Sequence, residues 1–284
     1  MMILKNRITD SETGTSSSTF AYIFGVVCGD GYARVRKAKG RTSGEIILKV
    51  NDEDFAQTFK DYLERWSDRT AKLKYDGKRH CTYLCSKFHA GIILNYDIEQ
   101  IFLQNNDFKY AFLRGLFDSD GGIVAKNLNE RRKAKRWLHF SNSDAQIIYA
   151  VRKLFREFGL KYSFTSRIHS GFGSERIQYE IKVYNLQGLF FYYKNIGFSI
   201  QRKQEDLKKT ISSYDYYSSE LFNKAKELHK TMGFRKIAKE INVPENVVYR
   251  WLFKDYKDKI IDMDGGKNGC KNIYDENLPL VQEN

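Results

Sequence analysis

The sequence predicts a mixed α/β (α+β) chain made of two similar halves and a small helical domain after them. A nine-residue motif occurs twice at a separation of 90 residues, and the same order of helical and strand patterns follows each copy. After residue 218 the pattern changes to short helices. We therefore expect two pseudo-symmetric αββαββα repeats and a C-terminal helical module.

Composition excludes several classes of protein. The chain has 284 residues, of which 42% are apolar and 15% aromatic, so it is long and apolar enough to build real cores rather than stay disordered. No apolar run approaches the roughly 18–20 residues that span a bilayer, and no secretory signal is visible. Four cysteines do not make a disulfide scaffold. These features predict an intracellular protein (cytoplasm, nucleoid or organelle) without a membrane partner.

The positive charge is concentrated in one part of the chain. Lys and Arg exceed Asp and Glu by 13, and all of this excess lies in residues 1–211, because residues 212–284 hold 12 of each sign. A basic surface of this size predicts a polyanionic partner, most often nucleic acid. The alternative is a soluble basic protein with no such partner.

Each repeat is expected to begin with a helix that ends in the motif. In the first repeat we expect strands at 32–39 and 45–50, a helix at 52–66 capped by Asn51 or Asp52, strands at 71–75 and 81–87, and a helical stretch at 90–104. In the second we expect strands at 122–126 and 137–141, a helix at 145–158 between Asp144 and Gly159, strands at 162–169 and 177–184, and a helical run at 186–209 broken near Gly197. Short helices at 220–231, 234–241 and 245–253 complete the pattern.

These elements divide the chain into five predicted parts. They are an N-terminal arm at 1–19, the repeats at 20–107 and 108–211, a helix-turn-helix at 218–254 and a polar tail at 255–284.

The two motifs, at 23–31 (IFGVVCGDG) and 113–121 (LRGLFDSDG), place small residues one helical turn apart. Gly25 and Gly29 in the first copy, and Gly115 and Ser119 in the second, would let the two helix backbones pack closely. The helix ends would then meet and bring Asp30 and Asp120 together.

An aspartate at a helix C-terminus is electrostatically unfavourable, and two side by side are worse. A divalent cation resolves this conflict, and carboxylates suit Mg²⁺, which also binds phosphate oxygens. The alternative is that Asp-Gly merely forms a turn that ends each helix. Two copies in matching context on a basic chain favour the cation site.

Both motifs resemble the one that names the LAGLIDADG homing endonucleases, and residues 196–204 (IGFSIQRKQ) resemble the end of such domains. The resemblance covers about residues 20–210. It implies a monomeric, single-chain DNA endonuclease in which paired helices form the spine and the strands form a saddle of antiparallel sheets in the major groove. It also implies Mg²⁺-dependent cleavage of both strands of a long asymmetric target with 3′ overhangs, with Mn²⁺ or Ca²⁺ able to replace Mg²⁺ in binding. Asp30 and Asp120 would be the metal-binding catalytic carboxylates.

The chain departs from the family pattern at two places. The sixth motif position is Cys28 in the first copy and Asp118 in the second, and we expect little consequence. Gln201 stands where relatives often carry a lysine, so we assign the auxiliary catalytic role to Lys203. Lys203 and its neighbour Arg202 can alternatively serve the backbone.

Basic residues on the predicted strands form the expected DNA-contacting set. Period-two alternation puts Arg34 and Arg36 on one sheet face, as it does Lys72 and Lys74. The full set is Arg34, Arg36, Lys37, Lys39, Lys49, Lys72, Lys74, Lys126, Arg131, Lys135, Arg167 and Lys182, with Tyr249 and Arg250 in the C-terminal module. Together they suit base readout and phosphate contact, although any single one is also compatible with a solvated strand face.

Residues 234–253 resemble a helix-turn-helix of the resolvase and homeodomain-like kind. Its core would be Ile237, Ala238, Ile241, Val243, Val248, Trp251 and Leu252. Glu245, Asn246, Tyr249 and Arg250 would then face the major groove. The alternative is a helical cap on the main domain.

A zinc site at His80, Cys81, Cys85 and His89 is disfavoured. The spacing is unusual for a structural finger, and two cysteines four residues apart on a strand lie too far apart for easy chelation.

The competing function is a non-cleaving nucleic-acid binder, either a transcription regulator or an RNA-binding intron-splicing maturase. Regulators of that kind have typically lost the acidic pair, so Asp30 and Asp120 favour the nuclease. The initial Met and the lack of a terminal His-Asn pair predict a free-standing or intron-encoded enzyme rather than an intact intein.

Overall fold

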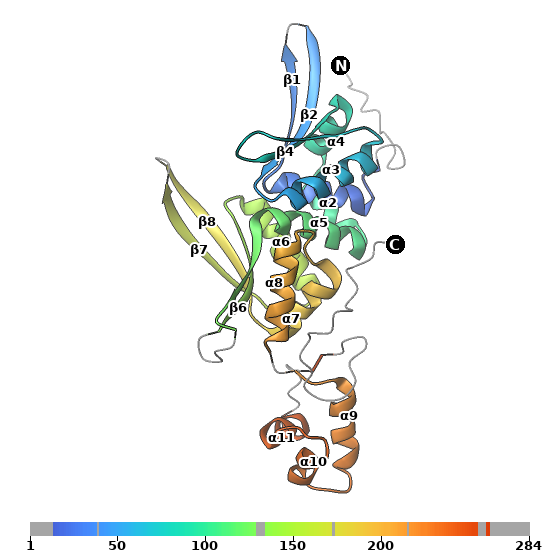
Figure 1. Ribbon diagram of the computed structural model, residues 1–284, viewed down its shortest axis with the longest axis vertical. Helices are drawn as coiled ribbons and strands as arrows, with labels where there is room; N and C mark the ends of the chain where they lie inside the picture. The colour runs from blue at the N-terminus through green and yellow to red at the C-terminus, as the bar shows by residue number, and fades with distance from the viewer. Residues whose placement is uncertain are drawn as a thin grey trace.

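A computed structural model describes residues 14–38, 40–128, 134–171, 174–214, 216–254 and 260–261. Within these ranges, the chain forms two four-stranded antiparallel sheets with helices packed on them, and a further group of helices lies at one end of the molecule (Figure 1). The predicted mixed α/β class is confirmed. No helix in the described part of the chain is long and apolar enough to cross a membrane.

The two repeats share the order αββαββα and the same sheet topology, and a further helix, α8 (Gln201–Ser212), follows the second repeat without a counterpart in the described part of the first. The first comprises α2 (Ser18–Cys28), β1 (Tyr32–Ala38), β2 (Arg41–Val50), α3 (Glu53–Ser67), β3 (Lys72–Tyr75), β4 (His80–Cys85), α4 (Lys87–Asn95) and the 3₁₀ helix η1 (Ile98–Leu103). The second comprises α5 (Asn106–Asp120), β5 (Gly121–Lys126), β6 (Lys135–Asn142), α6 (Ala145–Glu157), β7 (Ser163–Gly171), β8 (Ser174–Val183), α7 (Leu186–Phe191), the π-helical turn η2 (Tyr192–Ile196) and α8 (Gln201–Ser212). The strand orders β1-β2-β4-β3 and β5-β6-β8-β7 are equivalent, which confirms the internal repeat.

Local sequence signals explain where most helices begin and end. The side chains of Ser17, Asn105 and Asp144 accept hydrogen bonds from the first turns of α2, α5 and α6. Gly159 has a φ of 67° just after α6, and Gly197 has a φ of 64° at the predicted break before α8. A positive φ suits glycine, which has no Cβ, so both residues favour the end of a helix.

Two local predictions were wrong. The strand expected at 81–87 ends at Cys85, because Ser86 caps α4 by accepting a hydrogen bond from the His89 amide. The helix expected at 90–104 is divided into α4 and η1, since Tyr96 is extended and Asp97 caps a new turn. Asp52 is the N-cap of α3, which agrees with the sequence analysis, although its side chain makes no capping hydrogen bond.

Each sheet has a buried face and an open face. The buried faces of both sheets contribute to one continuous core. Their almost fully buried side chains include Ile46, Leu48 and Leu84 in the first sheet and Leu138 and Phe140 in the second. Because side chains alternate along a strand, their neighbours lie on the opposite face, which we call the open face.

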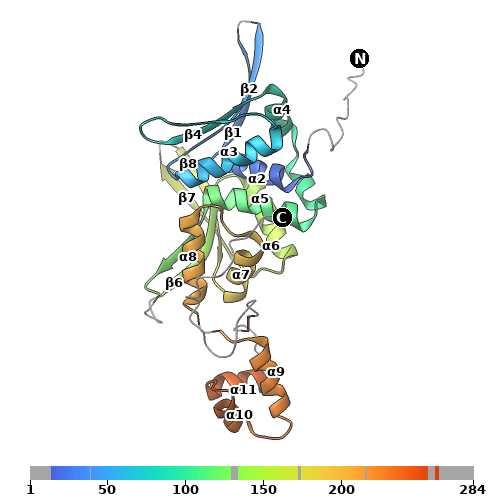
Figure 2. The ribbon, with the colours of Figure 1, turned by 45° about the vertical axis from the view of Figure 1, so that its right-hand side comes forward.

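The helices after residue 216 have a core of their own. They are α9 (Ser219–Leu228), α10 (Phe234–Glu240) and α11 (Glu245–Phe253), and we call them the C-terminal lobe. Ile237, Val248 and Trp251 are buried between them as expected, and Leu252 is partly buried. The lobe lies beyond the end of α8 in both views (Figures 1 and 2).

Two residues of the predicted polar tail have a structural role instead. Ile260 forms a β-bridge with Tyr217, and the Ile261 amide donates to the Tyr217 carbonyl at 2.9 Å. Ile261 is 4% exposed and joins the core of the main body. The tail prediction is therefore wrong at these residues, because their apolar side chains have a core to enter.

Candidate active site and nucleic-acid interface

Helices α2 and α5 pack in direct backbone contact at the centre of the molecule (Figure 2). A Cβ atom on Gly25 would lie 2.2 Å from the Phe112 carbonyl oxygen, and one on Gly115 would lie 2.2 Å from the Tyr22 carbonyl oxygen. Backbone atoms cannot give way locally as a flexible side chain can. The close helix pairing predicted from the small residues is therefore confirmed.

The contact continues at the ends of the two helices. A Cβ atom on Gly29 would lie 2.4 Å from the Ser119 Cβ and 3.4 Å from an oxygen of Asp120. The C-terminus of α2 thus touches the C-terminus of α5. All four predicted interface residues lie along this contact.

We predict that Gly115→Ala destabilises the protein by about 2 kcal/mol or more, because the added methyl group forces the helices apart. Gly91→Ala is the matched control, since a Cβ on Gly91 in α4 meets nothing within 4 Å. This control should stabilise the protein by roughly 0.5–1 kcal/mol, as Ala favours a helix more than Gly does. Urea unfolding of both variants measures the difference, and equal stabilities would contradict the close helix contact.

Asp30 and Asp120 occupy equivalent positions at these two helix ends. Asp120 is the last residue of α5, and Asp30 follows Gly29, the C-cap of α2. The Asp120 carboxylate accepts a hydrogen bond of 2.7 Å from the Asn142 amide. Neither aspartate forms an ion pair within the part of the chain that the structure describes.

Both carboxylates are harder to ionise than usual. Burial, and next the charge of Asp30, raise the pKa of Asp120 to about 6 despite the Asn142 hydrogen bond. Burial also raises the pKa of Asp30, while the positive charges of Lys203 and Arg79 oppose this shift. The repulsion agrees with the sequence-based expectation that the two aspartates lie near each other.

This shift predicts how stability depends on pH in the absence of divalent cations. A carboxyl with a raised folded-state pKa destabilises the fold once it ionises, so Asp120 should lower stability as pH rises from about 4 to about 6. Asp120→Asn removes this cost and should stabilise the metal-free protein by about 1–2 kcal/mol at pH 7, with no gain below about pH 4. Asp118 titrates in the same window, so the difference between wild type and Asp120→Asn across pH isolates Asp120. A gain that did not change with pH would contradict the assignment.

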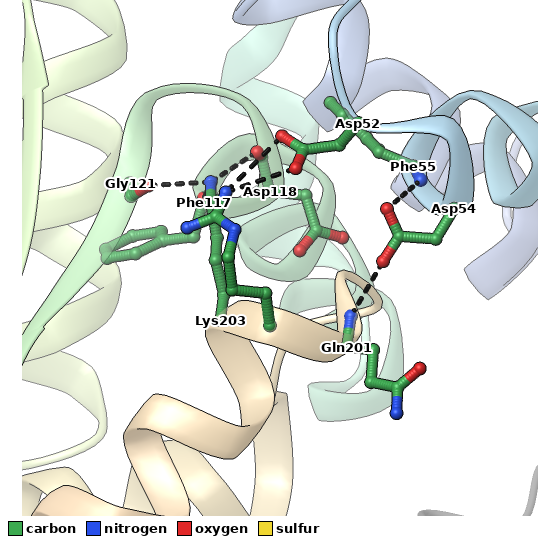
Figure 3. Close-up of polar contacts among 9 residues, drawn as sticks. Asp52, Asp54, Phe55, Phe117, Asp118, Gly121, Gln201 and Lys203 are labelled. Carbon is green, nitrogen blue, oxygen red and sulfur yellow. Dashed lines mark hydrogen bonds and ion pairs between the residues drawn. The ribbon is translucent and has the colours of Figure 1, made fainter.

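Lys203 lies beneath the end of α5 rather than free in the site (Figure 3). Its ammonium donates to the carbonyl oxygens of Phe117, Asp118 and Gly121 at 3.2, 2.6 and 2.8 Å. The side chain is 9% exposed, and burial lowers its pKa although nearby carboxylates oppose the shift. Its three N–H donors are all used, so this geometry favours the alternative in which Lys203 serves the backbone. It holds the turn that carries Asp120.

The sixth motif position has a larger role than we expected. Asp118 is 1% exposed, and its carboxylate accepts hydrogen bonds from the Ser199 amide at 3.1 Å, the Ser199 hydroxyl and the Tyr22 hydroxyl at 3.0 Å. These contacts join α5 to α2 and to the segment before α8. In the first repeat the position is Cys28, whose thiol pKa is raised to about 12 by burial, so it stays neutral.

A second group of contacts joins α8 to the first repeat (Figure 3). The Gln201 amide donates to Asp54 at 2.9 Å, and Arg202 pairs with Asp52 at 3.2 Å. The Gln201 side chain instead donates to Glu205 at 3.0 Å. The position where relatives often carry lysine is therefore occupied by a residue that stabilises the start of α8.

Residues that sequence analysis missed also surround the two aspartates. Asn142, the last residue of β6, orients Asp120, and the charge of Arg79 acts on Asp30. His139 lies nearby on the open face, and burial lowers its pKa. No sequence signal marks these residues, because Asn142 and His139 reach the site through strand pairing and Arg79 lies in the turn between β3 and β4.

The first sheet presents cations in register on its open face. Lys49 pairs with Cys81, which pairs with Lys74 on the next strand. Lys72 pairs with Tyr83. The ammonium groups of Lys72 and Lys74 lie 6.0 and 5.8 Å from the centre of the Tyr83 ring. The predicted lysines thus form one surface with an aromatic centre.

Arg34 and Arg36 share this open face, as predicted. Arg34 forms a close ion pair with Glu45, and Arg36 lies 3.9 Å from the same carboxylate. Lys37 is exposed on the opposite face of β1. Lys39 lies outside the described residues.

The second sheet presents an equivalent but different surface. Lys126 pairs with Lys135 at one end of the open face, and Arg167 is exposed on β7. Lys182 forms an ion pair of 2.7 Å with Glu180 on the same face. Arg131 lies outside the described residues. Tyr249 and Arg250 are exposed on α11, apart from both sheets.

The cysteines and histidines considered for a zinc site lie in different environments. Cys81 and Cys85 lie on the open face of β4, whereas the His89 ring packs against Trp66 and contacts Ser86. The described residues contain no group of three or more His, Cys, Asp or Glu side chains able to hold a metal ion.

Comparison with known proteins identifies the class to which this fold belongs. Residues 107–197 match the family model described as a LAGLIDADG-like domain. The second repeat is therefore similar to a LAGLIDADG-like domain. The fold of the two repeats together is that of solved homing endonuclease structures, as the motifs led us to expect.

The individual proteins that this chain resembles share little sequence identity with it. The homing endonuclease I-DmoI, in a structure with DNA and calcium, superimposes with a TM-score of 0.52 and 18% identity over 68% of this chain and 98% of that chain. A structure of mesophilic I-DmoI variants gives a TM-score of 0.51 and 19% identity over 64% of this chain and 97% of that chain. The uncharacterized protein MJ0398 of Methanocaldococcus jannaschii is 24% identical over 204 residues, 70% of this chain and 73% of the relative. The uncharacterized protein MJ1054 of the same organism is 25% identical over 72% of this chain, but the match spans only 22% of that protein.

Proposed function

We propose that this protein is a divalent-cation-dependent endonuclease that cuts both strands of a specific duplex DNA sequence. The observation that carries the proposal is the pair of aspartates, one from each repeat, at the touching ends of α2 and α5. The open faces of the two sheets also carry Lys and Arg side chains, on a chain with a net charge of +13. The likeness to I-DmoI, solved with DNA and calcium, supports the same function.

The aspartate pair fits a divalent cation. Carboxylate oxygens are the ligands that Mg²⁺ and Ca²⁺ prefer. Burial raises the pKa of both groups, and the charge of Asp30 adds to this for Asp120, so a bound cation would favour their ionised forms. Asp30 and Asp120 would hold the cation. When bound, it would supply the positive charge that stabilises a phosphodiester undergoing hydrolysis and would favour ionisation of the attacking water.

The remaining residues of the site position these carboxylates. Asn142 fixes the orientation of Asp120, and Lys203 holds the backbone of the turn that carries it. Asp118 joins that turn to α2 and to the start of α8. Precise positioning matters because small misplacements of catalytic groups reduce rates strongly.

The differences between the repeats determine the form of the target. The two open faces carry different side chains, so each should read a different half-site, and the whole target should be long and asymmetric. We propose that a single chain suffices, that the cuts leave 3′ overhangs, and that the C-terminal lobe adds a further DNA contact.

Cleavage of a randomised duplex library tests the proposal. The protein is incubated with the library in Mg²⁺ and, separately, in EDTA, and the new ends are sequenced. We expect one enriched sequence cut with a single fixed stagger in Mg²⁺ and no cutting in EDTA. Selective retention of one sequence without cleavage in any divalent cation would instead favour a non-cleaving regulator.

A further inference from the structure

The outward face of α11 carries an unusual concentration of exposed aromatic side chains. Tyr249 is 42% exposed and Phe253 is 51% exposed, one turn apart, with ring centres separated by 5.0 Å. Phe234 at the start of α10 lies 5.5 and 6.2 Å from these two rings. We call Phe234, Tyr249 and Phe253 the α11 aromatic face. Phe234 also packs against the core of the lobe, but Tyr249 and Phe253 are not part of that core, which Val248 and Trp251 fill from the other side of α11.

Polar groups that suit DNA border this face. Asn246 and Arg250 are exposed on the same side of α11. Arg235 and Lys230 nearby have side chains that are 78% and 70% exposed. Residues 216–254 contain eight Lys and Arg but four Asp and Glu, so the lobe carries an excess of four positive charges although residues 212–284 as a whole are neutral.

The charge identifies the kind of partner. An apolar surface bordered by cations suits a polyanion that also presents apolar groups. Duplex DNA is such a polyanion, because the 5-methyl groups of thymine are exposed in its major groove. An exposed helix face fits the width of that groove. Asn next to an aromatic pair completes the pattern, since Asn pairs with adenine, the base opposite thymine.

We propose that the α11 aromatic face reads thymine methyl groups, so that the lobe selects A·T base pairs next to the main target. The inference rests on the proposed function, because it requires the chain to bind duplex DNA. It assigns Phe253 a specificity-determining role that the helical pattern alone did not indicate.

The position of α11 agrees with a shared duplex. In Figure 1, α11 lies on the left of the lobe, the side toward which β7 and β8 project, whereas α9 lies on the right. A duplex held by the open faces could therefore continue toward α11. The target would then have a long part read by the sheets and a short A·T-rich part read by the lobe.

The test uses the full chain carrying Asp30→Asn and Asp120→Asn, so that bound DNA stays intact. Sequences retained from a randomised duplex library are compared for this protein and for the same protein with Tyr249→Ala and Phe253→Ala. We expect the long part in both selections and the short A·T-rich part only with the intact aromatic face. Absence of the long part from both selections would count against the proposed function itself.

Replacement of thymine by uracil then tests the methyl contact without changing the protein. Uracil lacks only the 5-methyl group, and a buried methyl group is worth about 0.8 kcal/mol, so each replacement in the short part should weaken binding about fourfold. The Tyr249→Ala, Phe253→Ala protein should bind both DNAs equally. A short part that is insensitive to uracil would overturn the methyl readout but not DNA binding by the lobe. Absence of a short part would overturn the lobe's sequence-specific DNA contact.

Discussion

Asp30→Asn and Asp120→Asn should each reduce the rate of DNA cleavage by about 10³-fold or more while leaving the affinity for the target unchanged or slightly higher. Each substitution keeps the shape of the side chain but removes the negative charge that would hold a divalent cation. Removal of that charge also reduces repulsion from DNA phosphates, so binding should not suffer. Single-turnover cleavage and equilibrium binding in Ca²⁺ measure the two effects on the same target.

Asp61→Asn is the matched control for this pair of variants. Asp61 is exposed on α3, where it accepts a hydrogen bond from Gln57, and the substitution makes the same chemical change away from the helix ends. It should cut at the wild-type rate. If Asp30→Asn or Asp120→Asn also cut at that rate, the assignment of the catalytic pair would be wrong.

Lys203→Met should destabilise the protein by about 3–5 kcal/mol. The substitution removes a buried charge that donates to three carbonyl oxygens and leaves those oxygens without their partner. The turn after α5 would loosen, and cleavage should fall with it. Urea unfolding gives the change in stability directly.

The control for this prediction lies on the same helix. Lys209 has a side chain that is 59% exposed and lies 3.8 Å from Asp206, so Lys209→Met should change stability by less than about 0.5 kcal/mol. Similar stabilities for Lys203→Met and Lys209→Met would show that Lys203 does not hold the turn. That result would instead favour the auxiliary catalytic role that the sequence suggested for Lys203.

The repeated motif made much of the fold and the site centre predictable. Because Gly25 and Gly115 recur at matching positions, the helix pairing could be derived, and Asp30 and Asp120 follow from it. Alternation along the strands placed Lys72 and Lys74 on one open face for the same reason. These features depend on local periodicity, which is visible in the amino-acid sequence itself.

The features that sequence analysis missed depend on contacts between distant residues. Asp118 is bound by Tyr22 and Ser199, 96 and 81 residues away, so its position in the motif could not indicate its burial. Asp52 has the sequence signature of a helix cap but pairs with Arg202, 150 residues further on. Ile261 enters the main core although the surrounding sequence is polar. Such contacts are determined by how the elements pack, not by their own patterns.

The most direct test of the central claim measures the cation itself. Electron paramagnetic resonance can count the Mn²⁺ held by the complex of the protein with its selected target, for wild type and for the Asp30→Asn, Asp120→Asn double variant. We predict that wild type retains Mn²⁺, that retention falls as pH drops below about 6 because protons compete for Asp120, and that the double variant retains far less. Equal Mn²⁺ retention by both proteins at all pH values would contradict the claim that these two aspartates hold the cation.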